Sequence, residues 1–123
     1  MKEEFKKTLV LGASPNPERY SFMVVKELQA HHHPVVAIGK RTGVIENVSI
    51  LTNHPPLENI HTVTLYLNSQ HQKEYYDYIL SLQPKRIIFN PGAENKELFL
   101  LAKQHGIEPV EACSLVILHT GQY

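Results

Sequence analysis

The sequence has almost no cysteine and no excess of positive over negative charge, and each of these features excludes a kind of protein. Cys113 is the single cysteine of 123 residues, so the chain can form no internal disulfide and no cysteine zinc site. Lysine and arginine together number 12 and aspartate and glutamate number 12. Without a net positive field, non-specific binding to nucleic acid or to anionic membrane is not expected, and any cationic site must be local.

Long apolar runs are also lacking. No stretch approaches the roughly 20 apolar residues of a membrane-spanning helix. Lysines precede a short apolar run near the start, as in a signal peptide, but Ser14, Pro15 and Asn16 interrupt that run. We therefore expect a cytoplasmic protein, in agreement with the single thiol.

Short segments rich in β-branched residues alternate with stretches of helical periodicity. The expected strands are residues 8–13, 34–39, 62–67, 86–92 and 107–112. Strands this apolar need cover on both faces, which the intervening helices supply. We predict an α/β fold: a single Rossmann-like, doubly wound domain over residues 1–123, with a mainly parallel sheet of about five strands and helices on both faces.

The first expected helix follows a polar loop. Ser21 can cap it, Val24, Val25 and Leu28 recur at helical spacing, and Pro34 stops it after a run of histidines. Residues 42–59 fit the alternation of strand and helix worst. Within them we interpret residues 48–51 (VSIL) as an extra extended piece where a regular unit would place a helix.

Two further helices are expected in the second half of the chain. Ser69 and Gln72 have the spacing of a capping box, which predicts the start of the second helix. The third helix is expected to start near Asn95 and to end at Gly106, since glycine is the common residue after a helix.

Ligands of an open parallel sheet bind beyond the carboxyl ends of its strands, where helix amino termini present unpaired N–H groups. The loops at that edge are residues 12–21, 39–43, 67–70, 90–95 and the segment from 111. The first loop has only one of the three glycines of a dinucleotide fingerprint. Gly12 would allow close approach of a ligand, Ser14, Asn16 and Ser21 offer hydrogen bonds, and Arg19 suits a phosphate. We favour a phosphate site here over a plain, solvated turn.

The loop after the second strand discriminates between cofactors. A site for NAD would place Asp or Glu there to bind the ribose 2′-hydroxyl, whereas this chain has Gly39, Lys40 and Arg41. Two adjacent cations suit a phosphate on the ribose, as in NADP or the 3′-phosphorylated ADP of coenzyme A. A basic turn that merely faces solvent is an equal alternative.

Catalytic interpretations are weak. Ser14 lies in a sequence like a nucleophile elbow, but Pro15 has no N–H to donate to an oxyanion. The chain has no P-loop motif, and its only aspartate, Asp77, falls within an expected helix, so phosphoryl transfer with Mg²⁺ is not expected. Glu94 is a remaining candidate, although it has no evident partner.

Neither the histidine run nor the cysteine predicts a reactive site. Residues 31–33 are consecutive histidines, and consecutive helical side chains point about 100° apart and cannot converge on one metal ion. We expect them to end a helix, where positive charge is favourable. Cys113 follows the last strand; a small, buried structural role is favoured over a reactive thiol because no His or Arg adjoins it.

Together these loops resemble a known family, the small stand-alone CoA-binding proteins, which are similar to the nucleotide-binding domain of the succinyl-CoA ligase α subunit. The resemblance rests on VLGASPNPERYS, VVAIGKR, NPGAEN and HGIEPVEACSLV, and covers almost the whole chain. It implies a Rossmann-like domain with the pyrophosphate at residues 12–21 and the adenosine near residues 38–41. The candidate CoA-binding residues are Gly12, Ala13, Ser14, Asn16, Arg19, Ser21, Ile38, Gly39, Lys40, Arg41, Leu67, Asn68, Pro91 and Gly92.

Many relatives have Asn-Pro where this chain has Gly39-Lys40, which makes contacts at that loop the hardest to transfer. The ligases also need further domains, including one with a phosphorylated histidine, so ligase chemistry is not expected. The leading hypothesis is a non-catalytic module for CoA or an acyl-CoA, acting as a sensor, carrier or subunit, with a homo-oligomer or a protein partner left open. The alternatives are a small enzyme using NADP or a CoA thioester through Cys113 or Glu94, and an interaction domain with an empty pocket.

Overall fold

The computed structural model describes residues 5–123 and contains one seven-stranded sheet in the order β3-β4-β2-β1-β5-β6-β7. Neighbouring strands are parallel except β3 and β4, which are antiparallel. The strands are β1 (Thr8–Leu11), β2 (Val35–Ile38), β3 (Gly43–Ile45), β4 (Val48–Leu51), β5 (Thr62–Leu65), β6 (Arg86–Phe89) and β7 (Glu108–Glu111). The helices are α1 (Tyr20–Ala30), α2 (Ser69–Gln72), the 3₁₀ helix η1 (Lys73–Tyr75), α3 (Tyr76–Leu82), α4 (Lys96–Gln104) and α5 (Ser114–His119).

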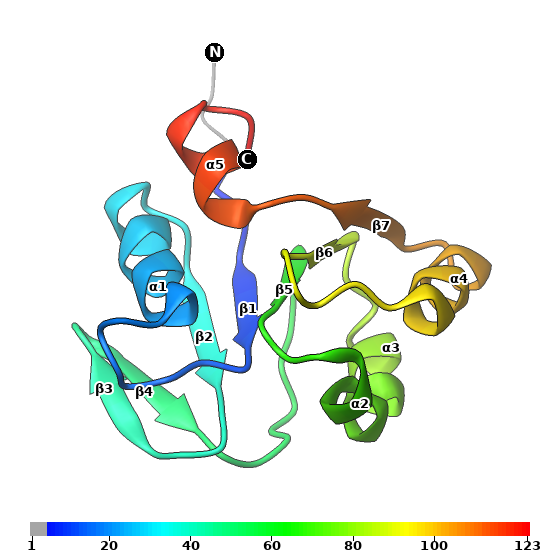
Figure 1. Ribbon diagram of the computed structural model, residues 1–123, viewed down its shortest axis with the longest axis horizontal. Helices are drawn as coiled ribbons and strands as arrows, with labels where there is room; N and C mark the ends of the chain where they lie inside the picture. The colour runs from blue at the N-terminus through cyan, green and yellow to red at the C-terminus, as the bar shows by residue number, and fades with distance from the viewer. Residues whose placement is uncertain (1–4) are drawn as a thin grey trace.

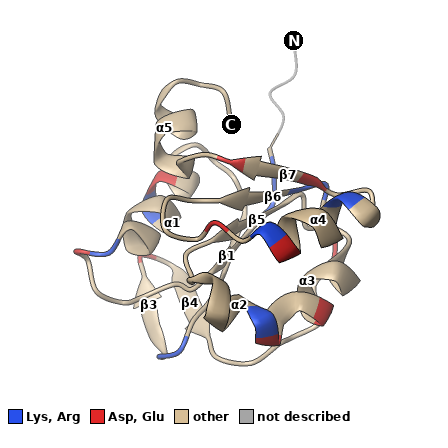
Figure 2. Cartoon of the chain, turned by 45° about the vertical axis from the view of Figure 1, so that its right-hand side comes forward, with Lys and Arg blue, Asp and Glu red and all other residues tan. Residues whose placement is uncertain are grey.

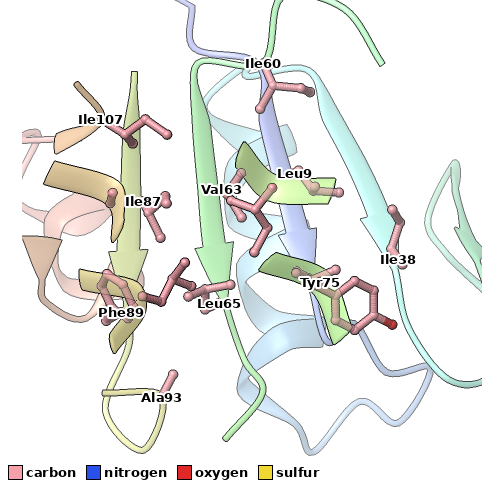
Figure 3. Packing of buried hydrophobic residues seen from close by; sticks show 14 residues of the cluster. Leu9, Ile38, Ile60, Val63, Leu65, Tyr75, Ile87, Phe89, Ala93 and Ile107 are labelled. Atoms are coloured by element: carbon pink, nitrogen blue, oxygen red, sulfur yellow. The ribbon is translucent and has the colours of Figure 1, made fainter. Parts of the chain in front are cut away.

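Helices cover both faces of the sheet (Figure 1). Successive residues of β1 point to opposite faces of the sheet. Leu9 packs in one core cluster with Ile79 of α3, whereas Val10 packs in the other cluster with Val25 of α1. All four side chains are fully buried. Figure 3 shows the first cluster, in which side chains of β2, β1, β5 and β6 pack together beside Tyr75.

The predicted fold class is confirmed, and the predicted number of strands is wrong by two. The difference is the β3–β4 hairpin, which lies at one edge of the sheet. Residues 48–51 form β4, so the expected extended piece exists. β3 has only three residues and follows the basic turn directly, so no period could reveal it.

Two predicted helix starts are also corrected. Arg19 is the cap residue of α1, without a side-chain cap bond, and Ser21 is buried inside the first turn. Asn68 rather than Ser69 caps α2, because its side chain accepts a hydrogen bond from the amide of His71. The predicted start of α4 is confirmed: Asn95 is its cap and accepts from the amide of Leu98.

Two features of the helices were not expected from the sequence. The second helix is divided into α2, η1 and α3, and a short α5 follows β7. Within residues 5–123, none of these helices combines the length and apolarity needed to cross a membrane.

Candidate functional site

A cleft of about 610 Å³ lies beyond the carboxyl ends of the central strands β2, β1, β5 and β6. Its walls come from the loops that follow these four strands and from Tyr75 of η1. Every candidate binding residue from the sequence lines this cleft except Ile38. Ile38 is fully buried in β2, so its side chain does not reach the cleft: the residue ends the strand inside the core, and the residues after it line the cleft.

The loop between β1 and α1 is held by its own polar groups. The amides of Gly12 and Ala13 both donate to the carbonyl of Ile38, at 2.8 and 2.9 Å, so they are already engaged. The Ser14 hydroxyl oxygen accepts from the amide of Asn16 at 3.1 Å, and the Asn16 side-chain oxygen accepts from the amide of Glu18 at 3.0 Å. Ser14 and Asn16 therefore shape the loop, and the hydroxyl and amide hydrogens of their side chains remain for a ligand.

The start of α1 supplies the free donors of the cleft. Within the described chain, the backbone amides of Tyr20 and Ser21 donate to no protein group. Both residues line the cleft, as does Arg19, whose side chain is exposed. Unpaired amides and the positive end of an eleven-residue helix dipole favour an anion at this point.

Glycine is required here mainly by the protein itself. A Cβ on Gly39 would lie 2.1 Å from the carbonyl oxygen of Ala13, and one on Gly12, where φ is +96°, would lie 2.9 Å from the backbone of Tyr66. The loops after β1, β2 and β5 therefore approach each other backbone to backbone. The fold therefore requires glycine at residue 12 independently of any ligand.

Three cations border the cleft without an acidic partner. Arg19, Lys40 and Arg41 are exposed and line it. The only ion pair that residues 5–123 contain joins His31 to Glu27 at 3.6 Å. Figure 2 shows both signs of charge spread over the molecule, so this local group is not part of a general basic surface.

A buried polar side chain fixes the opposite wall. Gln72 is fully buried, and its amide nitrogen donates to the carbonyls of Leu67 and Ala93, at 2.8 Å each. Its oxygen accepts from the side chain of Asn95 at 2.8 Å. Gln72 thus holds together the loops after β5 and β6, which carry the lining residues Leu67, Asn68, Pro91 and Gly92.

Five lining residues were not among the candidates from the sequence: Pro15, Tyr20, Tyr66, Tyr75 and Ala93. Tyr66 directly follows β5, so its place beyond a strand end was a usable signal. Tyr75 comes from a helix and had no such signal. Burial raises the pKa of the Tyr66 phenol and the nearby Cys113 thiol adds to this, outweighing the opposing effect of the Thr64 and Ser114 hydroxyls, so the phenol stays neutral.

A side pocket of about 230 Å³ adjoins the cleft. Tyr20, Tyr66 and Pro91 line both cavities, and the other side-pocket residues are Asn90, Cys113 and Leu115. Cys113 is half-buried rather than buried, so the expected small core residue is instead part of a cavity wall. Its position after β7 places it at the same edge of the sheet as the cleft.

Two other groups that the sequence drew attention to lie apart from the cleft. The carboxylate of Glu94 accepts a hydrogen bond from the amide of Gly92 at 2.9 Å and does not line either cavity. The histidines after α1 diverge: His31 pairs with Glu27, and the Nδ1 of His33 accepts from the amide of Lys6 at 2.9 Å. Among residues 5–123, no three His, Cys, Asp or Glu side chains gather in a way that could hold a metal ion.

The geometry of the sheet and the cleft indicates the class of domain. A doubly wound, mainly parallel sheet with a ligand-sized cleft beyond its central strands is the arrangement of Rossmann-like domains. Residues 6–119 match the family model described as CoA binding domain. The chain therefore belongs to the CoA-binding domain family.

Solved structures agree with this fold. The chain is similar to an uncharacterised protein known from a crystal structure, with a TM-score of 0.96, 45% identity, and coverage of 98% of this chain and 100% of that one. It also resembles a hypothetical protein from Pyrococcus horikoshii OT3, with a TM-score of 0.85, 23% identity and coverage of 96% and 84%. For a protein from Thermus thermophilus the TM-score is 0.83 and the identity 19%, and the match covers 97% of this chain and 91% of that one. The last two likenesses support the fold alone, and no curated protein matches the chain.

Proposed function

We propose that residues 1–123 act as one domain that binds coenzyme A or an acyl-CoA in the cytoplasm, as a non-catalytic sensor, carrier or subunit. One observation carries this proposal. Three cations without acidic partners and the unpaired amides of α1 surround a single cleft, in a chain of the CoA-binding domain family. Such a group of donors suits a ligand with several phosphates.

The pyrophosphate of the ligand fits the start of α1. The amides of Tyr20 and Ser21 are free to donate there, and Arg19 can add a planar guanidinium that binds two phosphate oxygens at once. Residue 12 must be glycine for the loop to take this shape, because of its contact with Tyr66.

The 3′-phosphate on the ribose fits the loop after β2. Lys40 and Arg41 follow Gly39, which packs against the backbone of Ala13 and so brings the loop beside the phosphate site. No carboxylate at this strand end would compete for the cations or bind a free 2′-hydroxyl. The loop thus favours a phosphorylated ribose.

A non-catalytic role agrees with the groups that line the cleft. Ser14 is engaged in the loop and precedes a proline, and Glu94 lies outside both cavities. Among the described residues, the charged side chains that line the cleft are all cations, so no carboxylate faces it as a general base.

The ligand is identified most simply from the protein itself. Protein purified without added nucleotide is denatured, the released small molecules are analysed by mass spectrometry, and the empty protein is titrated calorimetrically with CoA and with NADP. We expect CoA or an acyl-CoA to be released and CoA to bind. Binding of NADP in preference to CoA, or of neither, would overturn the proposal.

A further inference from the structure

The side pocket next to the cleft points to the kind of acyl group that the protein recognises. We infer that this pocket, between the starts of α1 and α5, receives the short, uncharged acyl group of an acyl-CoA whose nucleotide lies in the main cleft. This inference rests on the proposed function, because the nucleotide site fixes where the acyl end can reach.

Reach is the first argument. The phosphate site lies beyond β1, and the side pocket lies beyond β6 and β7, which are two and three strands away in the order β1-β5-β6-β7. Strands lie about 4.8 Å apart, so the distance to cover is about 10 to 14 Å. The pantetheine arm has roughly a dozen bonds, the length of about four residues of extended chain, and spans at most about 14 Å.

Continuity is the second argument. Tyr20, Tyr66 and Pro91 form walls of both cavities, so a chain that crosses the cleft from α1 towards β6 arrives at the side pocket. The lining residues that the loops after β5 and β6 contribute to the main cleft, Leu67, Asn68 and Gly92, carry no charge. They suit the amide-linked arm better than a phosphate.

The chemistry of the walls is the third argument. None of the six lining residues of the side pocket is charged. Asn90 is its most polar wall, and both hydrogens of its amide are already donated, to the hydroxyl of Thr64 at 2.7 Å and to the carbonyl of Leu65 at 2.9 Å. The Asn90 oxygen accepts from the amide of Ser114 at 2.8 Å. A terminal carboxylate in this pocket would therefore lose hydration without gaining an ion pair, because no lining residue is a cation.

Volume limits the length of the acyl group. At the roughly 30 Å³ that a water molecule occupies in the liquid, a pocket of about 230 Å³ holds about seven non-hydrogen atoms. Acyl groups of about two to six carbons fit within this limit. Each buried methylene should tighten binding roughly fourfold until the pocket is full.

The test is a series of calorimetric titrations of the reduced protein with CoA, acetyl-CoA, butyryl-CoA, succinyl-CoA and palmitoyl-CoA. Butyryl-CoA and succinyl-CoA form a matched pair, because both have four acyl carbons and only succinyl ends in a carboxylate. We expect butyryl-CoA to bind at least about tenfold more tightly than CoA, and succinyl-CoA and palmitoyl-CoA to gain nothing over CoA.

Variants locate the effect in the pocket. Cys113→Leu adds bulk to the pocket wall and should reduce the ratio of the butyryl-CoA and CoA affinities to about one. Val116→Leu adds a methylene on the exposed face of α5 and should leave the ratio as in the wild type. Because the chain has a single cysteine, alkylation gives a second readout in the wild type: butyryl-CoA should slow alkylation of Cys113 more than CoA does.

The outcomes separate this inference from the proposed function. If CoA binds and the acyl group changes neither affinity nor alkylation, the acyl pocket is wrong and the proposed function stands. If succinyl-CoA binds as tightly as butyryl-CoA, the preference for an uncharged group is wrong. If CoA itself does not bind, the proposed function fails and the inference fails with it.

Discussion

Basic side chains at the two edges of the sheet behave in opposite ways. At the amino edge, where β1, β5 and β6 begin, Arg86 donates to the hydroxyl of Thr62 at 2.9 Å and to the main-chain oxygen of Tyr123 at 2.8 Å. Its guanidinium also lies 4.3 Å from the centre of the Tyr123 ring. Lys6 donates to the same Tyr123 oxygen at 2.7 Å. These cations hold together segments that are distant in the sequence.

At the carboxyl edge, the side chains of Arg19, Lys40 and Arg41 make no hydrogen bond or ion pair with the rest of residues 5–123. The difference teaches that a cation is informative about function only once its protein partners are known. A basic residue with several partners stabilises the fold, whereas one left unpaired beside a cleft is available to a ligand.

Removing a cation at the amino edge should have the largest effect, and on stability. Arg86→Ala loses two charge-assisted hydrogen bonds and the contact with the Tyr123 ring, which should lower the free energy of unfolding by about 2 to 4 kcal/mol. Lys85→Ala, at the exposed neighbouring position, is the control and should change stability by less than about 0.5 kcal/mol. Urea unfolding measures both. Equal stability of the two variants would remove the contrast between the edges.

Removing a cation at the carboxyl edge should affect binding rather than stability. Arg19→Ala loses a charge-assisted contact to phosphate, worth about 1.5 to 3 kcal/mol, so the affinity for CoA should fall roughly tenfold to a hundredfold. Lys26→Ala on the exposed face of the same helix is the matched control and should bind as the wild type does. Calorimetry that finds Arg19→Ala unimpaired would exclude this residue from the phosphate site.

The smallest effect expected is a pH dependence confined to the amino edge. Burial, and then the charges of His31, Lys6, Arg86 and His61, lower the pKa of His33 from its ordinary value of 6.5. Below pH 6.5 the unfolded chain binds more protons at this residue than the folded protein, so stability is greatest above that pH and falls as the pH decreases through the lowered pKa.

Melting temperatures at pH 5.5 and 7.5 measure this dependence. His33→Asn keeps an acceptor for the amide of Lys6 and removes the titration, so it should lose less stability on acidification than the wild type. His71→Asn, at an exposed site on α2, should behave as the wild type. The same loss in His33→Asn would mean that His33 does not contribute to the pH dependence.

The fold could be predicted because the hydrophobic periodicity of each segment indicates whether it is a strand or a helix, and most segments form the expected element in the structure. Strand β3 and helix α5 were missed because each is shorter than a period can reveal, whereas β4 coincides with the extended piece that was expected at residues 48–51. Positions beyond strand ends predicted most of the cleft. Ile38 is the exception, because it still belongs to β2 and its side chain lies in the core.

Contacts between segments that are distant in the sequence could not be predicted from it. Nothing near Tyr75 in the sequence showed that η1 would reach the cleft, and nothing near Cys113 showed a cavity beside Tyr66. The glycines illustrate the same limit: Gly12 was correctly expected to matter for close approach, but the approaching group is the backbone of Tyr66.

The central claim is that unpaired cations at the carboxyl edge bind a ribose phosphate, and comparing the affinities of CoA and dephospho-CoA tests it most directly. The wild type should prefer CoA roughly tenfold to a hundredfold, and less so with added salt. Lys40→Ala combined with Arg41→Ala should abolish the preference and leave dephospho-CoA binding nearly unchanged. Lys26→Ala combined with Lys85→Ala, which removes the same charge away from the cleft, should keep the preference. Equal affinity of the wild type for the two ligands would contradict the claim.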